Sequence, residues 1–291
     1  MADDSVYALN ESTKAGIEQE TDRLNVQHHF FTDVMNSELL PSHIASHLAS
    51  IPSPRVCDFA TGTTVWLREV AKTLPTSAEL VGLDFDTSKF PKPETLPPNI
   101  TLGVADGYKP FPEEYQNRFD VVHLRFFLFA LKNGKGVPLV KNLLSLLRPG
   151  GWLVWVETNP NAWNAEPPSE FLFRYQKLQY LSAKEDNVDQ NTPWVITNYI
   201  TQAGLEDCDE RHYNTASWLF GPEGSGWLAR QHHEIFTGLG QVMRGMLSRG
   251  GVDGLRTQQD FDELMTRLKE DMNDTRKWHG PIVRAWGRKP S

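Results

Sequence analysis

Three acidic residues follow short apolar runs in the first half of the chain, and their spacing suits a site for a nucleoside. Asp58, Asp84 and Asp106 each stand at or near the carboxyl end of a run that we predict to be a β-strand. Asp84 comes roughly 20 residues after a small-residue turn, where dinucleotide-type sites place the acid that binds ribose hydroxyls. Asp106 could accept a hydrogen bond from an adenine amino group. The alternative is that Asp84 caps a turn, because Asp86 and Ser88 follow it.

The turn before the Asp84 strand has the composition of a ligand-binding loop. Residues 56–64 (VCDFATGTT) pass from an apolar run through small residues into a predicted helix. Small residues let the backbone approach a ligand closely, and the start of the helix offers free N–H groups. In a doubly wound sheet such turns lie at the carboxyl ends of the strands, where ligands bind. A tight turn with one glycine is also a common structural feature, so this segment is informative only together with the acids.

One histidine is placed for chemistry. His123 ends the apolar run 119–123 and is the candidate catalytic base. A hydroxyl group that attacks as a nucleophile would need such a base, whereas a neutral amine would not. A structural or cofactor-positioning role is the alternative. The histidine pairs at 28–29 and 232–233 are adjacent, and neighbours on a helix point about 100° apart, so neither pair can chelate a metal alone. We expect no bound metal.

Short apolar runs alternate with amphipathic stretches in the part of the chain that carries these residues. Apolar runs predict strands at 55–60, 80–84, 100–104, 119–123 and 152–157, and helical periodicity predicts helices at 64–74 and 139–147. This alternation predicts an α/β fold with a doubly wound, mainly parallel sheet. Two further strands, at 205–213 and 278–289, would make the sheet seven-stranded.

Helical segments on either side of this region are expected to form a cap. We predict an N-terminal helical cap at 1–50, an α/β ligand-binding domain at 51–215, an inserted helical cap at 216–275 and the final strand at 276–291. The cap is rich in large apolar side chains, and most of them must form its core. A few should line a pocket for a flat or apolar small molecule, and our candidates are Trp163, Trp218, Trp227 and Met243.

The motifs in their order and spacing resemble a known family, the class I S-adenosylmethionine-dependent methyltransferases, and within it the LaeA-like group of fungal secondary metabolism. The resemblance covers residues 22–290. It is carried by RLNVQH at 23–28, the turn at 58–66, LPPN at 96–99, FDVVHLR at 119–125, LRPGGW at 147–152, AGL at 203–205 and WGRKP at 286–290.

The resemblance implies a Rossmann-like fold and S-adenosyl-L-methionine as the cofactor. By the matching motifs, the residues implied in cofactor binding are Arg23, Gln27, Asp58, Ala60, Gly62, Asp84, Asp106, Gly107, His123 and Arg125. The turn departs from the family's Gly-x-Gly-x-Gly pattern, because Ala60 and Thr64 replace the first and third glycines. Thr64 brings a β-branched side chain to the start of the helix.

Composition narrows the function that this resemblance implies. The net charge of −8 disfavours an electrostatic nucleic-acid binder, and no run is apolar enough for a membrane helix. We therefore expect a cytoplasmic enzyme that methylates an oxygen, nitrogen or sulfur atom of a small aromatic or apolar secondary metabolite. Two alternatives stay open: a regulatory or protein methyltransferase, and a methyltransferase-like scaffold that catalyses a non-methylating reaction such as a cyclisation.

Overall fold

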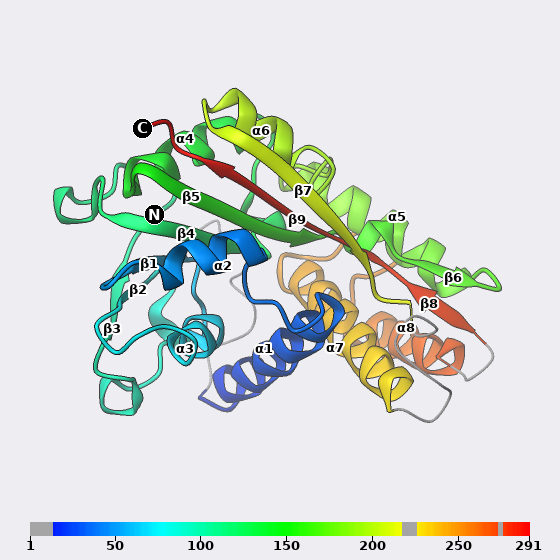
Figure 1. Ribbon diagram of the computed structural model, residues 1–291. Helices are drawn as coiled ribbons and strands as arrows, with labels where there is room; N and C mark the ends of the chain where they lie inside the picture. Colours follow the sequence, from blue (N-terminus) through cyan, green and yellow to red (C-terminus); the bar gives the residue numbers. More distant parts are fainter. Residues whose placement is uncertain (1–13, 217–225, 273–275) are drawn as a thin grey trace.

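A twisted seven-stranded sheet forms the centre of the computed structural model, which describes residues 14–216, 226–272 and 276–291 (Figure 1). In spatial order its strands are β3 (Ile100–Val104), β2 (Glu79–Asp84), β1 (Arg55–Phe59), β4 (Phe119–Arg125), β5 (Leu147–Thr158), β9 (Pro281–Arg288) and β7 (Glu206–Asn214). The first five are mutually parallel, and β9 runs antiparallel to both of its neighbours. The predicted α/β class and the mainly parallel sheet are confirmed.

Helices cover both faces of this sheet. On one face, α2 (Ser42–Ala49) and α3 (Val65–Ala71) pack on apolar side chains of β1, β4 and β5. On the other face, α4 (Gly136–Leu146) and α6 (Ile196–Gln202) pack on the alternate side chains of the same strands. Coverage on both sides explains why the parallel strands read as nearly continuous apolar runs rather than as alternating ones.

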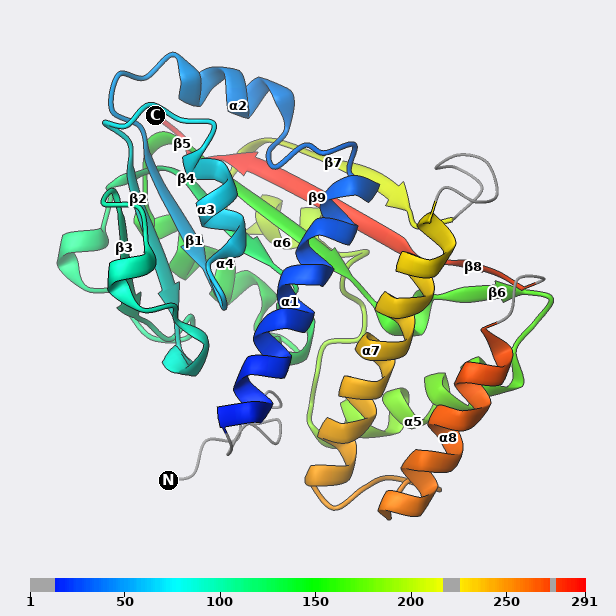
Figure 2. The same cartoon turned by 90° about the horizontal axis from the view of Figure 1, so that it is seen from below.

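Four longer helices lie beyond the carboxyl ends of the parallel strands (Figure 2). They are α1 (Lys14–Val34), α5 (Glu170–Glu185), α7 (Trp227–Ser248) and α8 (Gln258–Asp271). Apolar residues of α5, α7 and α8 share one core. The sequence prediction grouped the α5 residues with the sheet domain, whereas their packing groups them with the inserted helices. We propose that the cap includes α5 as well as α1, α7 and α8.

The end of the chain differs from the single predicted strand at 278–289. It forms two strands, because β8 (Lys277–His279) pairs with β6 (Asn164–Glu166) in a separate ribbon and only β9 joins the main sheet. The break falls at Gly280, where a Cβ would lie 2.5 Å from the ring of Trp163. Close approach of that indole therefore requires a glycine at the point where the chain passes from one sheet to the other.

No helix in the described ranges is long and apolar enough to cross a membrane. Over the same ranges, no group of three or more His, Cys, Asp or Glu side chains is arranged to hold a metal ion.

Candidate functional site

Asp84 joins the ends of β1 and β2 at the carboxyl edge of the sheet. Its Oδ2 accepts a hydrogen bond from the backbone N–H of Gly62 at 2.8 Å, and its Oδ1 accepts one from the N–H of Asp86 at 3.0 Å. Burial raises the pKa of this carboxyl group. A carboxylate has about four lone-pair positions, so Asp84 can hold the turn and still accept hydrogen bonds from a diol. The turn-capping alternative and the ribose-binding prediction are thus compatible.

In the turn between β1 and α3, every second residue has a left-handed backbone conformation. Ala60, Gly62 and Thr64 have φ values of +57°, +52° and +62°. A Cβ built on Gly62 would meet no atom of the described chain within 4 Å, so the space above this turn is open. Thr64 is fully buried, and its hydroxyl has no hydrogen-bond partner among the described residues. An open, small-residue turn beside a carboxylate fits the ribose and methionine parts of S-adenosylmethionine.

His123 supports Asp58 from the neighbouring strand and is closed off from solvent. Asp58 and His123 are paired in the register of β1 and β4, and His123 Nδ1 lies 2.8 Å from Asp58 Oδ1. The imidazole stacks on the indole of Trp66 with ring centroids 3.6 Å apart. Burial lowers the pKa of His123, although Asp58 opposes that shift, so the neutral ring donates its Nδ1–H to the carboxylate. This geometry favours the positioning role over that of a catalytic base.

The edge formed by β2 and β3 offers an apolar surface next to acids. Asp106 accepts a hydrogen bond from the N–H of Tyr108 at 2.9 Å. Phe85, Val104 and Tyr108 are 49%, 65% and 41% exposed, which is unusual for side chains of this size. Val104 pairs with Asp84 in the sheet register, so this apolar surface borders the Asp84 carboxylate. Such a surface suits a planar base such as adenine.

Gly107 follows Asp106 and has a packing role of its own. A Cβ on it would come within 3.0 Å of both Phe59 and Leu139. The requirement for glycine at this position thus comes from the sheet core behind the edge.

A cavity lies where α1, α5 and α7 meet the ends of β4 and β5. Its wall is mainly apolar and includes Phe31, Phe126, Leu128, Phe129, Trp163, Ile235, Leu239, Val242 and Met246. Trp163, one of the predicted pocket residues, therefore lines this cavity. Trp227 and Met243 are not among the described residues that line the cavity. Trp227 stacks on Phe30, and Met243 lies in the core shared by α5, α7 and α8. Trp218 lies outside the described residues.

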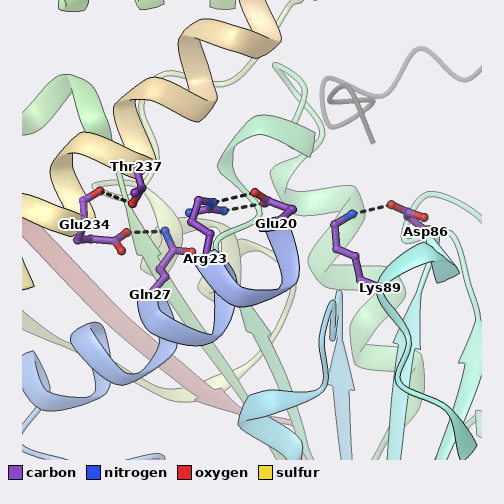
Figure 3. A network of polar contacts seen from close by, with 7 residues as sticks. All are labelled: Glu20, Arg23, Gln27, Asp86, Lys89, Glu234 and Thr237. Carbon is purple, nitrogen blue, oxygen red and sulfur yellow. Dashed lines mark hydrogen bonds and ion pairs between the residues drawn. The ribbon is translucent and has the colours of Figure 1, made fainter. Parts of the chain in front are cut away.

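Polar contacts between helices border this cavity at two places. Gln27 of α1 donates a hydrogen bond to Glu234 Oε1 of α7 at 2.7 Å (Figure 3). One turn earlier on α1, Arg23 pairs with Glu20 through two hydrogen bonds of 2.8 Å. Elsewhere on the wall, Arg249 of α7 pairs with Asp186 of α5 at 3.1 Å. The predicted residues Arg23 and Gln27 thus line the cavity and belong to its polar border.

Arg125 continues β4 toward α1. Its guanidinium lies 2.8 Å from His28 Nδ1, and burial lowers the pKa of Arg125 to about 10. Arg125 thereby connects the end of β4 to the helix that carries Arg23 and Gln27. It is not among the described residues that line the cavity.

Sequence reasoning missed most of the polar residues of the cavity wall, among them Glu157, Gln179 and Glu234. Glu157 ends β5, and its Oε2 accepts a hydrogen bond from the N–H of Phe127 at 2.7 Å. Burial raises the pKa of Glu157 to about 8. The rule that selected Asp84, an acid at the end of an apolar strand, would also have selected Glu157. Gln179 and Glu234 lie within amphipathic helices, where nothing in the sequence separates them from surface residues.

Comparisons with known proteins agree with this geometry. A family model described as a methyltransferase domain matches residues 35–207. The N-methyltransferase tcpN of Claviceps purpurea is 28% identical over 96% of this chain and 97% of its own length. Methyltransferase grgD of a Penicillium species is 31% identical over 76% of this chain and 75% of its own, and N-methyltransferase gliN of Aspergillus fumigatus is 26% identical over 94% of each.

Solved structures with the same fold share little sequence. Phosphoethanolamine N-methyltransferase 2 of Haemonchus contortus, in complex with S-adenosyl-L-methionine, superposes with a TM-score of 0.52 at 15% identity. The match covers 100% of this chain but only 61% of that enzyme. The cyclase SpnF matches with a TM-score of 0.50, also at 15% identity, over 85% of this chain and 78% of its own. At these identities the likeness shows the fold alone.

Proposed function

We propose that this chain, which belongs to the methyltransferase-domain family, uses S-adenosyl-L-methionine to methylate a nitrogen atom of a small, largely apolar molecule. The observation that carries this proposal is the cavity between α1, α5 and α7. Its wall is mainly apolar with a few polar groups, the usual character of a small-molecule site. It also includes Arg23 and Gln27, which the family resemblance assigns to the cofactor.

The chain's own residues would bind and orient the two reactants. The cofactor supplies an electrophilic methyl group, so positioning of the acceptor provides much of the acceleration. Asp84 and the turn at Gly62 would hold the ribose, and the surface around Tyr108 would hold the adenine. Asp58, fixed by His123, would lie beside the methionine part.

Two arguments favour nitrogen as the acceptor atom. Two of the relatives named above, tcpN and gliN, are called N-methyltransferases. In addition, His123 is buried against Asp58 and is not among the described residues that line the cavity, so it is poorly placed as a base for a hydroxyl. A neutral amine does not need such a base. Membership of the LaeA-like group stays a prediction.

The α7 helix provides a matched pair of variants that tests the cavity. Gly238 lines it, and a Cβ there would have only Glu234 Oε1, at 3.7 Å, within contact distance among the described atoms. Gly238→Ala should therefore fold and place a methyl group in the acceptor space. Gly240 is not among the described residues that line the cavity. A Cβ added to it would lie 3.0 Å from the flexible end of the Met265 side chain. Gly240→Ala is the control for changes in helix propensity.

The experiment measures release of S-adenosylhomocysteine and the acceptor's gain of one methyl group by mass spectrometry. The panel pairs small apolar amines with their hydroxyl analogues. We expect amine methylation by the wild type, and a fall in kcat/KM of about 10-fold in Gly238→Ala but not in Gly240→Ala, since one methylene in a substrate pocket typically costs about 1–3 kcal/mol. Equal activity of the two variants would place the acceptor elsewhere, and methylation of the hydroxyl analogues alone would refute nitrogen as the acceptor atom.

A further inference from the structure

One face of α5 is turned toward the cavity. Four residues that line the cavity lie at positions i, i+3, i+4 and i+7, so they form a single stripe along the helix. They are Gln179, Ser182, Ala183 and Asp186. Two of them have evident partners. Arg249 of α7 pairs with Asp186 at 3.1 Å and donates to Ser182 Oγ at 3.2 Å.

Gln179 differs from the rest of the stripe because its polar group is buried without a partner. Only 1% of the residue is exposed, and neither Nε2 nor Oε1 has a hydrogen-bond partner in the part of the chain that the structure describes. A carboxamide can donate two hydrogen bonds and accept two. Leaving all of them unmade in a protein interior is destabilising, and native structures rarely do so.

A second buried glutamine shows what a structural role looks like in the same layer of helices. Gln231 of α7 is also fully buried, and its Oε1 has no partner among the described residues, but its Nε2 donates to the carbonyl oxygens of Thr215 at 2.6 Å and Trp278 at 2.9 Å. Gln231 therefore joins the chain on either side of the inserted helices. Within the described residues Gln179 has no comparable role, and its side chain contributes to the wall of the cavity instead.

Glu234 supplies a second unpaired oxygen to the same wall. Its Oε1 accepts from Gln27, whereas its buried Oε2 has no partner among the described residues. The cavity thus contains unpaired polar atoms on α5 and α7 within a mainly apolar wall. Such atoms are satisfied when a ligand with matching groups is bound.

We propose that Gln179 is a specificity-determining residue for the methyl acceptor. It recognises a group of the substrate that presents a hydrogen-bond donor and a hydrogen-bond acceptor close together. The carboxamide oxygen accepts from the ligand's donor, and the carboxamide NH₂ donates to the ligand's acceptor. Sites built to pair with such groups discriminate strongly against analogues that lack them, because the protein's buried polar atoms are then left unpaired. This inference rests on the proposed function, because it takes the cavity to be the acceptor site.

Two substitutions to methionine test this role through stability. Gln179→Met keeps the side chain's length and removes two unpaired polar groups, so the melting temperature should rise by roughly 2–4 °C. Gln231→Met removes two hydrogen bonds that are made, so its melting temperature should fall. A fall for Gln179→Met as well would show that its amide is already satisfied in the free protein, and this result would overturn the proposal.

Fragment binding to the full chain tests recognition without requiring turnover. The probes are benzamide, which has a neighbouring donor and acceptor, and ethylbenzene, which has neither; affinities come from ligand-observed NMR titrations. Gln179→Met should weaken benzamide binding by about 5- to 30-fold and leave ethylbenzene binding unchanged, whereas Gln231→Met should leave the ratio of the two affinities unchanged. An unchanged ratio in Gln179→Met would overturn the proposal.

Release of S-adenosylhomocysteine, measured separately, distinguishes this failure from failure of the proposed function. If the ratio changes as expected but no amine in the panel is methylated, the recognition site stands and nitrogen methylation fails. If amines are methylated and Gln179→Met alters neither the fragment ratio nor the order of acceptor preference, the function stands and the role of Gln179 fails.

Discussion

Replacing Thr64 by glycine should stabilise the protein, although the substitution removes a buried side chain. Thr64 precedes α3 with φ +62° and ψ +10°, a left-handed conformation that a β-branched residue rarely adopts. It makes no side-chain hydrogen bond to cap the helix, and its buried hydroxyl is unpaired among the described residues. Thr64→Gly removes both penalties at the turn that we assign to the cofactor.

The magnitude follows from opposing contributions. Left-handed strain costs a residue with a Cβ about 1–2 kcal/mol, and an unpaired buried hydroxyl about 1–3 kcal/mol. Against this, two buried carbon atoms are lost at about 0.8 kcal/mol each, and glycine adds about 0.4–1 kcal/mol of chain entropy to the unfolded state. At the middle of these ranges the gain exceeds the loss by about 1 kcal/mol.

Urea denaturation of three proteins checks this reasoning. Thr64→Ala is the control, because alanine loses the hydroxyl and methyl groups but keeps the Cβ that causes the left-handed strain. Relief of the strain is then offset by the loss of the buried Cβ and by the added chain entropy, so we expect the glycine and alanine variants to be equally stable to within about 1 kcal/mol. Calorimetry should give similar or modestly tighter S-adenosylmethionine binding for Thr64→Gly. A glycine variant less stable than the alanine variant by about 1.5 kcal/mol, the value expected without any strain, would refute the strain argument. A tenfold loss of affinity would show that the threonine itself contacts the cofactor.

Three further predictions concern groups buried near the cavity. Burial raises the pKa of Glu157 from 4.5 to about 8, so between these pH values the folded state holds a proton that the unfolded state releases. The free energy of unfolding should therefore fall as the pH rises from 4.5 to about 8. Urea denaturation at several pH values should show a flatter dependence for Glu157→Gln. Because Trp227 and Met243 lie in cores, truncation to alanine should cost about 3–5 and 2–5 kcal/mol in urea denaturation, and a loss below 1 kcal/mol would contradict their placement. His123→Phe should keep the stacked ring but remove the hydrogen bond to Asp58, and calorimetry should then show weaker S-adenosylmethionine binding; unchanged affinity would remove His123 from its positioning role.

The sequence was informative where local signals and the global fold agree. The strands from 55 to 157 have apolar runs bounded by turn residues, and all five lie in the observed sheet. The helix α5 went unnoticed because its exposed face carries Phe173 and Tyr180, which are 63% and 56% exposed and obscure the amphipathic pattern.

The candidate site was more predictable at the sheet edge than in the cap. Asp84 was found because strand ends of a parallel sheet converge on one edge, a rule that needs only the order of the elements. The cap has no such rule, since a large apolar side chain serves equally well in its core or in the cavity wall. Trp163 and Met243 look alike in the sequence, and the packing of α5 against α7 alone separates their roles.

Calorimetric titration with S-adenosyl-L-methionine tests the central claim, which is that the cofactor binds at the ends of β1 and β2 and the acceptor in the neighbouring cavity. The wild type should bind one equivalent. Asp84→Ala should bind about 10- to 150-fold more weakly, since hydrogen bonds to a charged group contribute about 1.5–3 kcal/mol. Gly238→Ala, altered only in the acceptor cavity, should bind the cofactor like the wild type. Unchanged affinity in a folded Asp84→Ala variant, or a comparable loss in Gly238→Ala, would contradict this assignment of the two sites.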